Sequence, residues 1–86
     1  MAVALTAAQT QLLIDLISAY NNGQSHFLLR IAAHGALINA LPVEETDVEA
    51  MLQAGVLAAM RTLDGSTTLT ITHTGFIYYE RLTHVQ

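Results

Sequence analysis

The feature that most constrains this chain is the Asp64-Gly65 pair inside "VLAAMRTLDGSTTLTIT". An Asp-Gly pair flanked by alternating apolar residues is a strong signal for a β-hairpin with a two-residue turn. Pairing across this turn brings four apolar side chains to one face of the ribbon, because the pleat turns every second residue the same way. The turn and the alternation therefore predict one register, with Met60 opposite Leu69 and Ala58 opposite Ile71.

Two helices are expected in the first half of the chain. Residues 7–20 repeat apolar side chains on one helical face, and Thr6 is a suitable N-cap. Because no basic segment precedes this run and Asp15 interrupts it, we interpret it as an amphipathic helix and not as a signal peptide. A second helix is expected from Ser25 to residue 37 or 38, with apolar residues again on one face.

Two further helices flank the ribbon. The "TDVE" stretch predicts a capping box in which Thr46 and Glu49 exchange side-chain bonds, and Gly55 ends that third helix. The segment "THTGFIYYERL" predicts a closing helix that is capped by Thr72 or Thr74.

The order of these elements resembles the winged helix-turn-helix domain. "DVEAMLQAGVL" is similar to the recognition helix of that family and the glycine and apolar pair that follow it. "LTITHTGFIYYERL" resembles the closing strand and helix of its transcriptional regulators, through Ile71, Thr72 and Gly75. The expected fold class is α+β, mainly α: one winged-helix-like domain over residues 1–86, with three helices, a two-stranded β-hairpin wing and a C-terminal helix.

The resemblance implies that the third helix enters the major groove of DNA and that the wing touches the backbone. The residues expected to contact DNA are then Gln53, which suits a base edge, and Arg61, the cation nearest the wing tip.

The charge of the chain disfavours DNA binding. The net charge is -4, lysine is absent, and only three arginines are present. Proteins draw much of their affinity for DNA from neutralised phosphates, so nucleic acid is a possible but disfavoured partner. The third helix is also acidic where it would meet phosphates, at Glu44, Glu45, Asp47 and Glu49.

We therefore expect a non-catalytic protein-interaction module that associates with itself, as a homodimer, or with another protein. The candidate interface combines four apolar residues expected at the surface with the acidic run: Ile14, Leu37, Leu63, Tyr78, Glu44, Glu45, Asp47 and Glu49. Two alternatives stay open. One is a DNA-binding transcriptional regulator of the winged-helix type. The other is an acidic inhibitor that occupies a basic nucleic-acid groove of another protein.

Catalytic, cofactor and metal residues are not expected. The chain has no cysteine and no Gly-rich phosphate loop, and no serine lies in a nucleophile motif. His26 and His34 would lie about 12 Å apart along a helix, too far to share a metal. Because no apolar run reaches the length of a membrane span and cysteine is absent, we expect a cytoplasmic protein.

Overall fold

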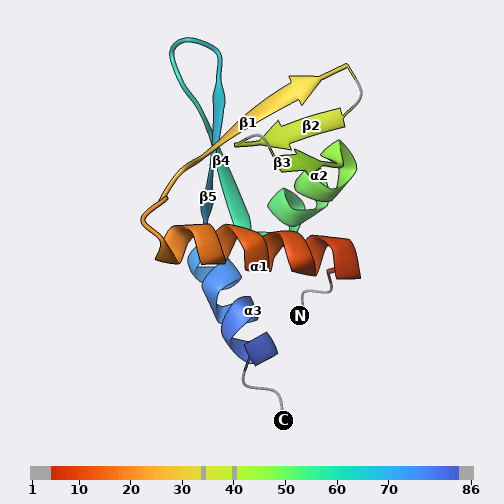
Figure 1. Cartoon of the computed structure of the whole chain (residues 1–86), viewed down its shortest axis with the longest axis vertical. Coiled ribbons are helices and arrows are strands. Elements are labelled where there is room, and N and C mark those ends of the chain that lie inside the picture. Colours follow the sequence, from red (N-terminus) through yellow and green to blue (C-terminus); the bar gives the residue numbers. More distant parts are fainter. Residues whose placement is uncertain (1–4, 34, 40, 84–86) are drawn as a thin grey trace.

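Three helices and one five-stranded antiparallel sheet make up the described part of the chain, in a computed structural model that covers residues 5–33, 35–39 and 41–83 (Figure 1). The strands lie in the order β3-β2-β1-β5-β4. The elements along the chain are α1 (Ala7–Asn21), β1 (Phe27–Ala32), β2 (Gly35–Ile38), β3 (Leu41–Val43), α2 (Glu45–Ala54), β4 (Leu57–Arg61), β5 (Thr67–Ile71) and α3 (His73–Thr83).

The predicted second helix is wrong, and the mainly α, winged-helix-like fold class is wrong with it. The segment that was expected to form this helix folds as strands β1 and β2, and β3 follows them. One backbone conformation excludes a continuous helix here, because Gly35, inside the expected helix, has φ +129°. Asn39, just beyond the expected end, has φ +48°. The backbone N–H of Asn39 donates to the Leu28 carbonyl at 3.1 Å, and its side-chain oxygen accepts from the Leu28 N–H at 3.0 Å.

Helix α1 forms as the sequence predicts. The Thr6 hydroxyl accepts from the Gln9 backbone N–H at 3.2 Å, and the Gln9 side chain accepts from the Thr6 N–H at 3.1 Å, which completes a capping box. The buried face of the helix carries Leu12, Leu13, Leu16 and Ile17.

Helix α2 begins one residue before the predicted cap. The chain enters it at Glu44, whose side chain makes no capping bond, so the predicted Thr46–Glu49 capping box is wrong. The end of the helix is confirmed, because Gly55 adopts the left-handed conformation with φ +82°. Val48 and Met51 are buried, as the apolar spacing predicts.

The β4–β5 hairpin is confirmed, but its predicted register is wrong by one residue. The Thr62 N–H donates to the Ser66 carbonyl at 2.8 Å, and the Gly65 N–H donates to the Thr62 carbonyl at 3.0 Å. These bonds close a three-residue loop in which only Gly65 has a positive φ, +89°. A two-residue turn of the expected kind needs positive φ at both central residues. Ala59 therefore lies opposite Leu69, and Met60 lies opposite Thr68.

The one-residue shift turns Met60 to the face of the sheet opposite the core. Side chains on the core face include Phe27, Ile38, Leu57 and Leu69, all buried. They pack with the buried faces of α1 and α2, and aromatic residues of α3 pack partly against the same cluster. On the other face, Leu28 is 40% exposed and Met60 is 66% exposed.

Helix α3 is attached closely to the end of α2. The Thr72 hydroxyl accepts from the Gly75 N–H at 3.1 Å, which confirms Thr72 as the cap, and it donates to the Gly55 carbonyl. Gly75 lies so close to the Val56 carbonyl oxygen that a Cβ here would be 2.4 Å from it. Figure 1 shows α1 and α3 together, with the β4–β5 loop at the far end of the molecule.

Candidate functional site: an apolar groove with acidic walls

A groove of about 670 Å³ lies between α1, strands β2 and β3, and the start of α2. Helix α1 forms one wall, and the two strands form the other. Its floor and walls are mainly apolar, because they come from small or aliphatic residues of both sides. The described residues that line it are Ala8, Gln11, Leu12, Asp15, Ala33, Gly35, Ala36, Leu37, Leu41, Pro42, Val43, Glu44 and Asp47.

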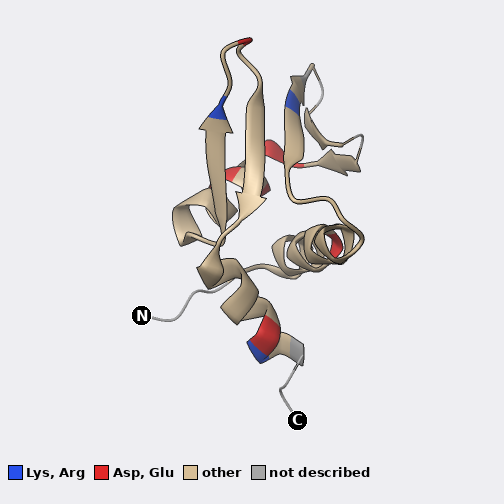
Figure 2. Ribbon diagram, turned by 90° about the vertical axis from the view of Figure 1, so that its left-hand side faces the viewer, with Lys and Arg blue, Asp and Glu red and all other residues tan. Residues whose placement is uncertain are grey.

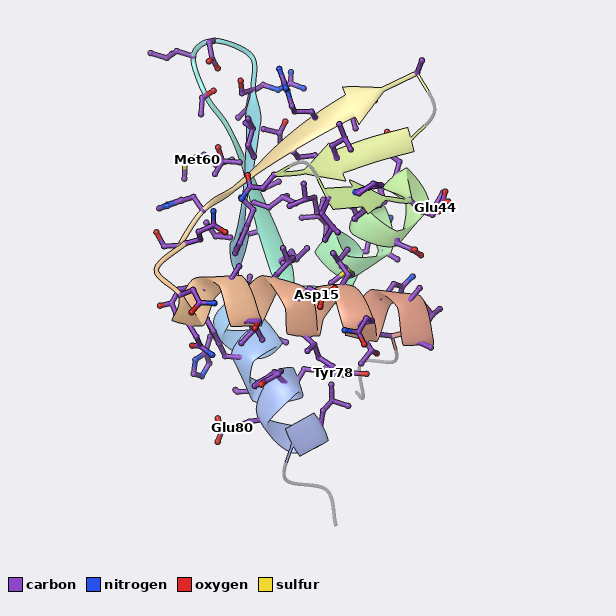
Figure 3. All side chains as sticks on the ribbon, viewed as in Figure 1. Asp15, Glu44, Met60, Tyr78 and Glu80 are labelled. Atoms are coloured by element: carbon purple, nitrogen blue, oxygen red, sulfur yellow. The ribbon has the colours of Figure 1, made fainter. Side chains whose placement is uncertain are left out.

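Three carboxylates line this groove, and its described lining holds no cation. Asp15 comes from α1 and Glu44 from the residue that enters α2, and both are exposed. Figure 3 shows Asp15 on the surface of α1 and Glu44 projecting outward at the start of α2. Asp47 is half-buried and accepts a hydrogen bond of 3.0 Å from the Gln9 side chain. The groove therefore offers apolar contact beside concentrated negative charge.

The first turn of α2 explains why Asp47 is tolerated close to Glu45. Glu45 and Asp47 lie in that turn, where the helix dipole favours negative charge. Figure 2 shows acidic positions gathered on this helix, while the basic positions lie apart. Arg30, Arg61 and Arg81 are on β1, β4 and α3 respectively.

The groove brings together three of the residues predicted for a partner interface: Leu37, Glu44 and Asp47. Glu45 and Glu49 are exposed on α2 but do not line the groove.

Three other predicted interface residues lie on separate elements. Ile14 is half-buried on α1, and Leu63 is fully exposed at the β4–β5 loop. Tyr78 is half-buried on α3 and packs partly against the core, so a substitution there also changes the packing of the fold. Figure 3 shows Tyr78 beside α1.

The residues expected to contact DNA lie apart from the groove. Gln53 is exposed near the end of α2, and Arg61 is exposed at the end of β4. His34 lies outside the described residues. Among the residues that the structure describes, no three His, Asp or Glu side chains form a group that could hold a metal ion.

The sequence did not indicate Asp15, Leu41 or Val43 as groove residues. In the sequence, Asp15 is an ordinary residue of the polar helix face. Leu41 and Val43 belong to strand β3, which was not expected. One signal was available: "ALPVEE" places a Pro-containing extended segment directly before an acidic helix start. Such a segment can form a wall beside the helix terminus.

No protein-family model, curated protein or solved structure matched the chain. Within the described residues, no helix combines the length and the apolar character that crossing a bilayer requires.

Proposed function

We propose that this chain is a non-catalytic protein-interaction module whose partner engages the groove between α1 and β2–β3. The observation that carries the proposal is the combination of an apolar floor with the carboxylates of Asp15, Glu44 and Asp47. A partner segment with an apolar side chain next to a lysine or arginine complements both features. Self-association and a cytoplasmic location remain part of the proposal.

A protein segment suits this groove better than a nucleic acid does. Phosphates would meet carboxylates, and the chain as a whole has a net charge of -4.

The experiment is a nuclear magnetic resonance titration with two short peptides. One alternates leucine with lysine, and the other has the same length with glutamate in place of lysine. We expect the lysine peptide to shift the amide signals of Leu12, Ala36 and Val43 in the groove, and the glutamate peptide to leave them unchanged. Equal shifts with both peptides, or none with the lysine peptide, would contradict the proposal.

A charge-neutral variant sharpens this test. Asp15→Asn with Glu44→Gln removes two groove charges and leaves Asp47 bonded to Gln9. We expect the affinity for the lysine peptide to fall by about two- to thirtyfold, since each exposed ion pair contributes roughly 0.2–1 kcal/mol. The matched control is Glu45→Gln with Glu49→Gln, which removes the same charge from α2 outside the groove.

The same variants separate the two alternatives, which stay predictions. An acidic inhibitor that acts through the whole run of residues 44–49 predicts that the control pair weakens binding as much as the groove pair. A DNA-binding regulator predicts a mass increase with duplex DNA that depends on Gln53 and Arg61 and disappears at high salt.

A further inference from the structure

The two edges of the sheet differ in how well they are protected against another strand. The β3 edge is three residues long and contains Pro42, which has no N–H to donate. The β4 edge is five residues long, "LAAMR", and it contains no proline and a single charged residue, Arg61, at its last position. Natural proteins usually block such an edge, so a long unblocked one indicates a place where a strand pairs.

The alternation of β4 directs some of its backbone hydrogen-bonding groups away from β5, those of Ala59 and Arg61 among them. The Val56 carbonyl accepts from the Thr72 N–H, and the Thr62 N–H donates to the Ser66 carbonyl. The backbone groups of Val56 and Thr62 therefore point toward β5. Since an antiparallel strand alternates its bonding direction, the backbone groups of Ala59 and Arg61 point away from β5. Among the described residues, β4 pairs with β5 alone.

The side chains of β4 leave room for a second strand. Ala58, Ala59 and Met60 are exposed, and the two alanines are small. Figure 3 shows Met60 projecting outward from the hairpin. Met60 lies opposite Thr68, which lies opposite Leu28, and these three form a row across the open face of the sheet.

We propose that β4 pairs antiparallel with β4 of a second copy of this chain, around a twofold axis at Met60. This inference rests on the proposed function, because it gives the self-association a surface. Ala59 of each copy exchanges backbone hydrogen bonds with the partner copy's Arg61, and the two sheets join into one. On the open face, Met60 packs against the partner copy's Met60. The row that begins at Leu28 then continues across both chains.

A second copy fits this edge for two reasons. The pairing is self-complementary, because the same two residues supply and receive all the new backbone bonds. The one charged side chain of the strand, Arg61, faces an alanine and not the other Arg61, so no like charges oppose each other.

The first test uses the absence of native cysteine. In the proposed pair, the two residue-60 Cα atoms lie about 4.5 Å apart, within the range that a disulfide spans. We expect Met60→Cys to form a covalent dimer under mild oxidation, and Leu63→Cys, an exposed control in the nearby loop, to remain mainly monomeric. Equal cross-linking of the two variants would overturn the proposal.

The second test is the solution mass across a range of concentrations. Met60→Lys places like charges at the axis, and we expect it to weaken the dimer by about tenfold or more. Met60→Leu keeps an apolar side chain and should weaken it little. A wild-type chain that stays monomeric, or a dimer that Met60→Lys leaves unchanged, would overturn the proposed pairing.

The peptide titration, repeated on Met60→Lys, distinguishes this inference from the proposed function. If Met60→Lys remains a dimer and the groove still binds the lysine peptide, the β4 pairing is wrong and the interaction module stands. If the wild-type chain neither dimerises nor binds the peptide, both proposals are wrong.

Discussion

The side chain of Gln9 joins the first turns of two helices, because its amide nitrogen donates a hydrogen bond of 3.0 Å to the carboxylate of Asp47. Gln9 is only 7% exposed, and its amide oxygen already accepts from the Thr6 N–H. One polar side chain therefore caps α1 and connects it to α2. This contact fixes the distance between two elements that line the groove.

Asp47→Ala should destabilise the fold by about 1–3 kcal/mol, because it leaves the Gln9 amide nitrogen without a partner in a nearly buried position. The control is Glu45→Ala, which removes an exposed carboxylate from the same helical turn and so reports the loss of the dipole interaction alone. Urea unfolding of both variants measures the difference. Equal losses of stability would show that the bond to Gln9 contributes nothing.

Gly75→Ala should also destabilise the fold, by about 1–3 kcal/mol, although alanine is the better helix former by about 1 kcal/mol. The new Cβ would lie 2.4 Å from the Val56 carbonyl oxygen and 3.0 Å from a methyl group of Ile71. That oxygen cannot move freely, since it accepts the Thr72 N–H at 3.1 Å. Thermal unfolding measures whether Gly75→Ala lowers or raises the stability, with the exposed Thr74→Ala as control. A gain in stability would contradict the close approach of Gly75 to the Val56 carbonyl oxygen.

Asp64 should titrate well below an ordinary aspartate. The Thr62 hydroxyl and then the Ser66 backbone N–H donate to its carboxylate and lower its pKa from 3.8 to about 2. Because the folded pKa is the lower one, the stabilisation is present above pH 3.8 and is lost as the pH falls toward 2.

The Asp64 carboxyl carbon signal, followed against pH, measures this pKa directly. Thr62→Val removes the largest cause and should move the pKa back toward 3.8, whereas Thr70→Val, on the same hairpin but distant from the carboxylate, should not. A wild-type pKa near 3.8 would contradict the loop geometry.

The sequence predicts the elements correctly where local chemistry and periodicity agree. At α1, the Thr6 cap and the apolar face point to the same helix, and this helix forms. The order of helix, hairpin and helix in the C-terminal half is also confirmed. Two details are wrong there: the cap of α2, which is Glu44 and not Thr46, and the register of the hairpin. The register differs because Asp64 does not adopt the positive φ that the expected two-residue turn needs.

The segment of residues 25–38 could not be assigned from its own pattern. Half of its residues are alanine, leucine or arginine, which are good helix formers, and a spacing of three and four suits a helix. The buried side chains of β1 and β2 alternate, but Leu28 and Leu37 on the opposite face hide that alternation. Pairing of β1 with the distant strand β5 favours a strand over a helix for this segment. The groove was unpredictable for the same reason, since β2 and β3 form one of its walls.

The aromatic contact between Tyr20 and Phe76 should hold α3 against α1. The ring centroids lie 5.0 Å apart in an edge-to-face arrangement with an interplanar angle of 65°. Such pairs contribute about 0.5–1.5 kcal/mol beyond the area that they bury. We expect the double variant Tyr20→Leu with Phe76→Leu to lose less stability than the two single variants lose in sum. Either substitution alone already removes the ring–ring interaction.

A double-mutant cycle in urea measures that coupling energy. Tyr20→Phe is the control, because it keeps the ring and removes only the hydroxyl of a side chain that is 42% exposed. We expect this control to retain near wild-type stability and the coupling to Phe76. If the losses of the two leucine variants add fully, the rings do not interact, and the attachment of α3 depends on the Thr72 and Gly75 contacts instead.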